Sequence, residues 1–144
     1  MKCWNGWGDE AIHYPLPDSA ARYLAELVGE SGKIYALDIH PLAIHKVRSI
    51  ASKKQLANVE PILSDCQTGL TDNSLDVVLL YDIFHDLSDP DRILEELHRV
   101  LKSEGILSFC DQHMKGNEIV SGVTSSGLFK LATKGRRTYT FSKS

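Results

Sequence analysis

The chain has no long hydrophobic run, no excess of positive charge and few cysteines among its 144 residues. No apolar run approaches the ~18 residues that a membrane-spanning helix needs, so we expect no membrane span. The net charge of −3 and the pI of about 6.0 do not indicate the basic face of a nucleic-acid-binding protein. We therefore expect no nucleic-acid partner.

The three cysteines, Cys3, Cys66 and Cys110, are widely spaced and form no CxxC pair. This spacing argues against a disulfide framework or a zinc site and fits a reducing cytoplasm. The histidines His40 and His45 lie too far from other ligand types to indicate a metal site. The first ten residues also lack the apolar core of a secretory signal peptide, so we expect a cytoplasmic protein without a bound metal.

A short apolar run from Ile34 to Leu37 is the strand around which the rest of the pattern is organised. It is long enough for a strand buried on both faces, and Asp38 stands where that strand should end. In an open parallel α/β sheet, ligands bind outside the carboxyl ends of the strands. The Asp38 carboxylate could therefore accept ribose hydroxyls, or it could cap the helix that begins near Pro41.

Helical and extended patterns alternate along the rest of the chain, which predicts an α/β fold with parallel strands joined by crossover helices. Pro61 lacks a backbone donor, so its strand should lie at a sheet edge, whereas the continuous run after Leu75 should be central. The last two strands should pair as an antiparallel hairpin. We predict one domain over residues 1–144, with 1–17 irregular or a remnant of a first strand. The expected helices are 18–28, 41–54, 90–102 and 116–125, and the expected strands are 11–14, 33–38, 58–65, 75–82, 106–111, 128–133 and 137–142.

Four predicted strands end in an acidic residue: Asp38, Asp65, Asp82 and Asp111. At one edge of a parallel sheet, these carboxylates would concentrate negative charge in one crevice. This is unfavourable unless hydroxyl groups or amines donate hydrogen bonds to them or a cation neutralises the charge. A neutral-to-cationic nucleoside fits such a crevice. Asp82 could equally be a structural acceptor for loop amides.

Five segments, in this order, resemble the class I S-adenosylmethionine-dependent methyltransferases, in particular the small-molecule branch that includes quinone-biosynthesis enzymes. They are GKIYALDIHPLAI, NVEPILSDC, LDVVLLYDIFHDLSDP, ILEELHRVLKSEGILSFCDQH and SGLFKLATKGRRTYTFSK. The resemblance covers roughly residues 19–144. It implies a Rossmann-like methyltransferase sheet with helices on both faces, S-adenosylmethionine as cofactor, and methyl transfer to a small-molecule acceptor by direct in-line displacement.

The resemblance also implies roles for single residues. Asp38 would hold the ribose, and Ile39 would pack on the adenine. Asp65, with Cys66 beside it, would meet the adenine amino group. The segment that begins with Tyr81 and Asp82 would line the methionine end of the cofactor and the substrate.

The sequence departs from this family at its glycine-rich turn. Spacing back from Asp38 places the family's GxGxG motif near residues 14–18, which contain no glycine. Gly6 and Gly8 form a Gly-x-Gly about eight residues earlier and would serve if the loop is longer. An altered or truncated N-terminal part would leave apolar sheet surface that a homodimer could cover. The alternative function is a catalytically inactive methyltransferase-like fold that binds a nucleoside or a partner protein.

His85, Asp111 and His113 are the candidates for a general base, which methyl transfer needs only when the acceptor must lose a proton. No spacing rule singles out one of the three, and each has a structural alternative as a hydrogen-bonded loop residue. A separate charged group, Glu95, Glu96, Arg99 and Lys102, is expected on a solvated helix face.

Overall fold

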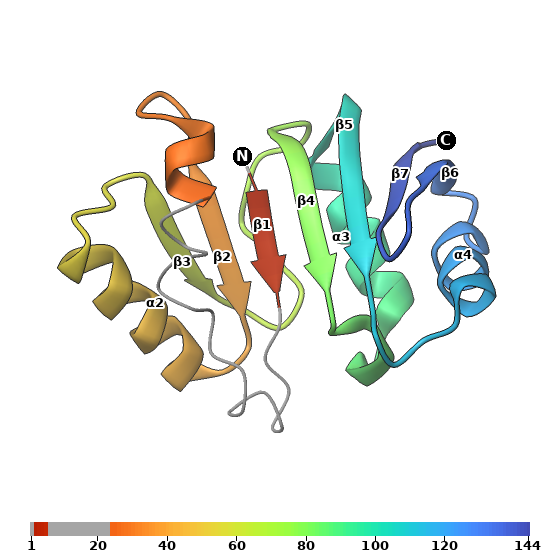
Figure 1. Cartoon of the computed structure of the whole chain (residues 1–144), viewed down its shortest axis with the longest axis horizontal. Helices are drawn as coiled ribbons and strands as arrows, with labels where there is room; N and C mark the ends of the chain where they lie inside the picture. The colour runs from red at the N-terminus through yellow and green to blue at the C-terminus, as the bar shows by residue number, and fades with distance from the viewer. Residues whose placement is uncertain (1, 6–23) are drawn as a thin grey trace.

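The centre of the molecule is a seven-stranded sheet with the strand order β3-β2-β1-β4-β5-β7-β6 (Figure 1). A computed structural model describes residues 2–5 and 24–144 of the chain. Strands β3, β2, β1, β4 and β5 are parallel, and β7 runs antiparallel between β5 and β6. The strands are β1 Lys2–Asn5, β2 Ile34–Asp38, β3 Val59–Leu63, β4 Leu75–Tyr81, β5 Leu101–Cys110, β6 Phe129–Lys134 and β7 Tyr139–Lys143.

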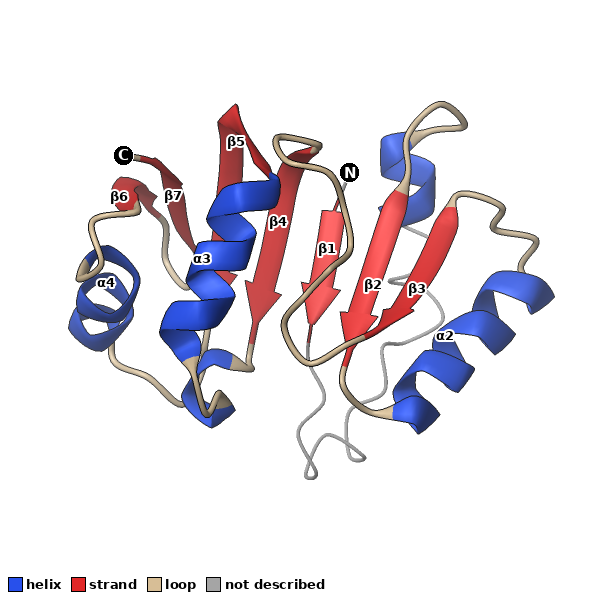
Figure 2. Ribbon diagram, turned by 180° about the vertical axis from the view of Figure 1, so that it is seen from behind, coloured by secondary structure: helices blue, strands red, loops and turns tan. Residues whose placement is uncertain are grey.

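Helices cover both faces of the sheet, as the sequence predicts. The helical residues 24–28 lie in front of β2 in Figure 1, whereas α3 lies in front of β4 and β5 in the view from behind (Figure 2). The remaining elements are α2 Pro41–Lys53, the short 3-10 helix η2 Phe84–Asp86, α3 Pro90–Val100 and α4 Gly116–Thr124.

Strand β1 lies earlier in the sequence than the spacing predicts. The backbone of Lys2–Asn5 occupies the middle of the sheet, paired with β2 on one side and β4 on the other. Gly6 is therefore the first residue after β1, which makes Gly6 and Gly8 the glycines that follow the first described strand. The strand expected at 11–14 and the glycine-free turn at 14–18 lie outside the described residues.

The predicted positions of the edge and central strands are confirmed. Pro61 lies in β3, at one edge of the sheet, where it pairs with Ala36 of β2. Strand β4 is central and pairs with β1 and β5. Because an edge strand has one side without a partner, a missing backbone N–H is tolerated there.

The largest part of the core lies between the sheet and α3. The buried stripe of α3 consists of Ile93, Leu94, Leu97 and Val100, at the spacing of one helix face. It packs in one cluster with the buried side chains of β4 and β5. This packing holds the carboxyl ends of β4 and β5 in place.

The end of α3 differs from the prediction. The helix stops at Val100, and Leu101 already pairs with Leu75 in the β4–β5 ladder, so Lys102 belongs to β5. The Lys102 ammonium lies 2.6 Å from Asp76 Oδ1 on β4. Helix propensity did not decide this boundary, because the sheet pairing of Leu101 competes with another helical turn.

Asp89 caps the N-terminus of α3, and its Oδ1 accepts a hydrogen bond of 3.2 Å from the Arg92 backbone N–H. We expect Asp89→Ala to lower the free energy of unfolding by about 1 kcal/mol, because one of the first N–H groups of the helix loses its acceptor. Urea unfolding followed by circular dichroism measures this change. Asp89→Ser retains a capping oxygen and should restore most of the loss; equal losses for both variants would contradict a capping role.

Candidate functional site

The four acidic residues predicted at strand ends lie at one edge of the sheet. Asp38 is the last residue of β2, Asp82 and Asp111 directly follow β4 and β5, and Asp65 is the second residue after β3. These four strands are parallel, so their carboxyl ends meet at the same edge. In Figure 1 this is the edge towards which the arrowheads of β1, β2, β4 and β5 point.

Asp38 is buried with half of its carboxylate unsatisfied. The residue is 4 % exposed, Oδ1 accepts a hydrogen bond of 2.8 Å from the His40 N–H, and Oδ2 has no hydrogen-bond partner among the described residues. Burial raises the pKa of this carboxyl above its usual value, against the smaller lowering by the His40 amide. A buried acceptor without a donor is costly, which marks Oδ2 as a position that a ligand hydroxyl would satisfy.

The alternative role of Asp38 as a helix cap is not what the structure shows. The N-cap of α2 is His40, whose Nδ1 accepts a hydrogen bond of 3.2 Å from the Leu42 N–H. Asp38 instead holds the His40 amide just before the helix. Its second oxygen is therefore not needed for α2.

Apolar side chains lie exposed next to Asp38. Ile39, directly after β2, is 63 % exposed, and Leu63 pairs with Asp38 across β2 and β3 and is exposed as well. Leu42, in the first turn of α2, is also exposed. The sequence alone could not place Leu63 beside Asp38, because that requires knowing which strand pairs with β2. Ile39, Leu42 and Leu63 together form exposed apolar surface at the same edge as the Asp38 carboxylate.

Asp65 and Cys66 are adjacent but lie in different environments. The Asp65 carboxylate is exposed, Oδ1 accepts a hydrogen bond of 2.7 Å from the Cys66 N–H, and Oδ2 lies 4.0 Å from Arg92 Nη1. The Cys66 amide is the main reason why the pKa of Asp65 lies below its usual value. The Cys66 side chain is buried, and this burial raises the pKa of its thiol. The Asp65 side chain can thus meet a ligand, whereas the thiol points into the protein.

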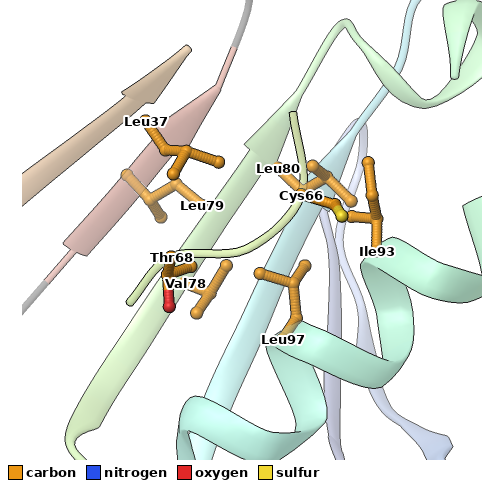
Figure 3. Close-up of a pocket in the computed structure, with 8 residues that line it drawn as sticks. All are labelled: Leu37, Cys66, Thr68, Val78, Leu79, Leu80, Ile93 and Leu97. Carbon is orange, nitrogen blue, oxygen red and sulfur yellow. The ribbon is translucent and has the colours of Figure 1, made fainter. Parts of the chain in front are cut away.

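The Cys66 side chain lines a small cavity between β4, α3 and the segment after β3 (Figure 3). Its volume is about 10 Å³, and apart from Thr68 the labelled side chains around it are apolar or sulfur-bearing. The Thr68 hydroxyl already donates a hydrogen bond of 2.6 Å to Glu96 Oε1, so its proton is not available to a ligand in the cavity. An apolar cavity of the size of one water molecule stays dry and does not accommodate a cofactor.

Tyr81 is the last residue of β4, and Asp82 follows it directly. The hydroxyl of Tyr81 lies 2.9 Å from Ser108 Oγ. The Asp82 carboxylate accepts two hydrogen bonds from Gln112, one from the backbone N–H (2.7 Å) and one from Nε2 (3.0 Å). Asp82 has a φ of 51°, a conformation that Asp and Asn tolerate better than most residues. Asp82 therefore acts as an acceptor for a loop amide, and its donor is Gln112. The sequence analysis did not identify this partner.

The structure brings the three candidates for a general base together. The Asp111 carboxylate is 0 % exposed; its Oδ2 lies 2.9 Å from His85 Nδ1, and its Oδ1 accepts a hydrogen bond of 3.0 Å from the His113 N–H. The rings of His85 and His113 lie 4.2 Å apart between centroids. Asp86, which the sequence analysis missed, places Oδ2 3.3 Å from His85 Nε2.

Positive charge lies near this end of β5. The connection between β6 and β7 carries Arg136 and Arg137, both exposed, and Tyr139 after it pairs with Phe109 of β5. Burial, Asp82 and Asp111 raise the pKa of the Cys110 thiol, whereas Arg137 acts in the opposite direction. These two arginines thus partly offset the negative charge of the acidic residues at the β5 end of this edge.

Two kinds of site are not found in the described part of the chain. Within residues 2–5 and 24–144, no group of His, Cys, Asp or Glu side chains is arranged to hold a metal ion. No helix in the same ranges is long and apolar enough to span a membrane.

A family model described as a methyltransferase domain matches residues 20–140, which is most of the chain. The chain belongs to the class I S-adenosylmethionine-dependent methyltransferases. This membership confirms the resemblance and the Rossmann-like fold, and it implies S-adenosylmethionine as the cofactor.

Related proteins support the same assignment for this methyltransferase domain. A demethylmenaquinone methyltransferase of Geobacillus sp. (strain WCH70) is 32% identical over 83 residues, and one of Geobacillus stearothermophilus is 34% identical over 84 residues. The matched regions cover 57% and 58% of this chain but only 36% of each relative, so this chain spans about a third of their length.

Solved structures share the fold. A crystal structure of an S-adenosylmethionine-dependent methyltransferase from Aquifex aeolicus superimposes with a TM-score of 0.74 at 26% identity, covering 99% of this chain and 81% of that one. A putative type 11 methyltransferase from Sulfolobus solfataricus superimposes with a TM-score of 0.69 at 19% identity, covering 99% and 83%, and is similar in fold alone.

The described residues fit the cofactor that the family implies. Asp38 Oδ2 is a buried acceptor that has no donor within residues 2–5 and 24–144, so a ribose hydroxyl could donate to it. The exposed side chain of Ile39 lies next to it, and the exposed carboxylate of Asp65 can accept from an amino group.

Proposed function

We propose that this chain binds S-adenosylmethionine at the carboxyl edge of its sheet and catalyses methyl transfer to a small-molecule acceptor by direct in-line displacement. The observation that carries the proposal is the buried Oδ2 of Asp38, which has no hydrogen-bond partner in the described part of the chain. When bound, the cofactor supplies a methyl group activated by its sulfonium. The protein contributes mainly position, since such a transfer requires aligned reactants at near-contact distance.

We assign the cofactor contacts by their place at this edge. Asp38 would hold the ribose, Ile39 would pack on the adenine, and Asp65 would accept from the adenine amino group. For Cys66 the backbone is the part that faces this edge, because its thiol lies in the core.

The methionine end of the cofactor would lie between β1 and β4. Tyr81 ends β4 and Asp82 follows it, and Gly6 and Gly8 are the glycines that come after β1 in the sequence. Glycines suit this place because a missing Cβ lets a ligand approach the backbone closely.

For the acceptor we propose an aromatic hydroquinone, the reduced form of a quinone, which carries ring hydroxyl groups. The proposal is supported by the Geobacillus relatives, which are named demethylmenaquinone methyltransferases. We place the reaction in the cytoplasm. Cys66 and Cys110 are free thiols, as is usual in a reducing compartment.

Asp38 is unfavourable for stability, which supports a role in binding. Its folded pKa is raised, so loss of its proton above the unfolded value of 3.8 opposes folding. Asp38→Asn removes this opposition while keeping the shape of the side chain. We therefore expect this variant to be at least as stable as the wild type at neutral pH.

Titration with S-adenosylhomocysteine by calorimetry tests the proposal. We expect micromolar binding by the wild type and binding weaker by about 10–100-fold in Asp38→Asn, because a charge-assisted hydrogen bond to the ribose is lost. Asp91→Asn, an exposed acid at the start of α3, serves as the control and should bind as the wild type does.

Absence of heat at millimolar ligand, with a folded wild type, would show that this chain does not bind the cofactor. Wild-type binding that Asp38→Asn leaves unchanged would remove Asp38 from the site. Binding without turnover of any acceptor would favour the alternative function, an inactive fold that binds a nucleoside.

A further inference from the structure

We propose that His85 is the general base of this methyltransferase and that Asp111 positions it, so that the acceptor reacts through a hydroxyl group. This inference rests on the proposed function, and it identifies the chemical class of the acceptor. It stands on the geometry of three side chains at the carboxyl ends of β4 and β5.

Asp111 is arranged as the fixed partner of His85. Its carboxylate is fully shielded from solvent, and its Oδ2 accepts from two groups of His85, the backbone N–H over 3.2 Å and the ring Nδ1 over 2.9 Å. Oδ1 accepts from the His113 N–H over 3.0 Å. A buried carboxylate with these donors is satisfied in place, so it can hold one orientation of the imidazole.

The hydrogen bond to Asp111 assigns the ring proton of neutral His85. A carboxylate only accepts, so the proton lies on Nδ1, and Nε2 keeps its lone pair. The His85 side chain remains 24 % exposed, in contrast to the buried Asp111. Nε2 is therefore the atom that can accept a proton, and this nitrogen lies 3.3 Å from Asp86 Oδ2.

The core holds His85 at the sheet edge. His85 lies in η2 between Phe84, which is buried, and Asp86. The ring of Phe84 packs edge-to-face on Phe109 of β5 at 5.2 Å between centroids. The His113 ring lies 4.2 Å from the His85 ring between centroids. These contacts place the His85 ring at the carboxyl ends of β4 and β5, where such sheets bind ligands.

A base at this place indicates what the acceptor is. A thiolate or another anion attacks a methyl group without giving up a proton, whereas a hydroxyl group is a poor nucleophile until its proton is removed. In the transfer, an oxygen lone pair forms the new O–C bond and the proton of that oxygen passes to His85 Nε2. The C–S bond that breaks returns its electron pair to sulfur.

The test uses catechol and naphthohydroquinone as hydroxyl probes and thiophenol as a probe that is already ionised at mildly alkaline pH. Product is measured by mass spectrometry for the wild type, His85→Gln, Asp111→Asn and His45→Gln. His45 is an exposed residue of α2 and serves as the matched control. Calorimetry with S-adenosylhomocysteine is run on every variant.

We expect His85→Gln to lower kcat for the hydroxyl probes by about 10²–10⁴-fold, with unchanged S-adenosylhomocysteine binding and a much smaller loss for thiophenol. Asp111→Asn should lower kcat at least about ten-fold, leave KM nearly unchanged and shift the pH profile of kcat, because the positioned tautomer is lost. Nitrogen-15 NMR should show the proton of His85 on Nδ1 in the wild type and a changed tautomer population in Asp111→Asn.

Each other outcome decides against the inference. If the wild type binds S-adenosylhomocysteine but methylates no hydroxyl probe, or if His85→Gln keeps full kcat, the assignment of His85 is wrong while cofactor binding stands. If both variants lose hydroxyl and thiol methylation equally, or lose cofactor binding, the pair is structural. If the wild type itself does not bind the cofactor, the proposed function and this inference both fail.

Discussion

Phe109→Ala is expected to lower the free energy of unfolding by about 3–5 kcal/mol, because it leaves a cavity in the centre of the core. The Phe109 side chain is 0 % exposed, and its ring packs edge-to-face against Phe84 at 5.2 Å and Phe141 at 6.3 Å between centroids. Strand β5 carries it in the rigid part of the sheet, where neighbouring strands cannot move in to fill the space.

Urea unfolding followed by circular dichroism measures the effect, and Ile106→Ala is the matched control. Ile106 lies on the same strand but is partly exposed, so its truncation should cost much less. A loss below about 1 kcal/mol in Phe109→Ala would show that this part of the core is looser than the structure indicates. Since Phe109 supports Phe84, the variant should also lose the defined NMR signals of the neighbouring His85 ring.

Acidification is expected to remove about 3 kcal/mol of stability through Glu96 alone. Its side chain is 12 % exposed, and its oxygens accept from Arg99, from the Thr68 N–H and from Thr68 Oγ1. Hydrogen bonds from Arg99 contribute most to lowering the pKa of Glu96 from 4.5 to about 2, and those from Thr68 add to it. Glu96 was expected on a solvated helix face. It pairs with Arg99 across one turn of α3, but its side chain is largely buried.

The direction of the effect follows from the lowered pKa. The unfolded carboxyl binds a proton at a higher pH than the folded one, so this stability is present above pH 4.5 and is lost as the pH falls through about 2. The pKa of Arg99 is raised by the same ion pair, so its shift is not a second contribution.

Urea unfolding near neutral pH and at pH about 2 should show this loss in the wild type, and Glu96→Gln should reduce the difference. Glu95→Gln changes the exposed neighbour on α3 and should retain the full pH dependence. An equal acid response in all three proteins would assign the loss to other carboxylates. Because Glu96 also holds Thr68, its replacement should loosen the segment that carries Asp65 and weaken cofactor binding.

Local chemistry made much of the fold predictable. Pro61 could only be tolerated at an edge, Asp89 and Pro90 begin α3 as their capping preferences require, and the alternating segments around Gly135 form the antiparallel β6–β7 pair. Each of these features depends on a few neighbouring residues. The acidic residues at strand ends were predictable for the same reason, since strand limits are local and parallel strands place their ends together.

Other features depend on pairing between distant parts of the chain. β1 has four residues, too few for a periodic pattern, and its place between β2 and β4 is determined by backbone pairing. Lys102 lies in β5 rather than in the predicted helix, because Leu101 pairs with Leu75. Leu42 is exposed although its spacing in α2 suited a buried face.

By itself, the sequence determined that this is an α/β methyltransferase sheet with acids at the carboxyl ends of its strands. Only the tertiary structure decided which acid keeps an oxygen without a hydrogen-bond partner among the described residues and which histidine is held by a buried carboxylate. Asp38 Oδ2 is unsatisfied because the fold buries it without a donor among the described residues, and His85 meets Asp111, 26 residues away, because β4 and β5 lie side by side. Both properties arise from burial and long-range contacts, which no local pattern encodes.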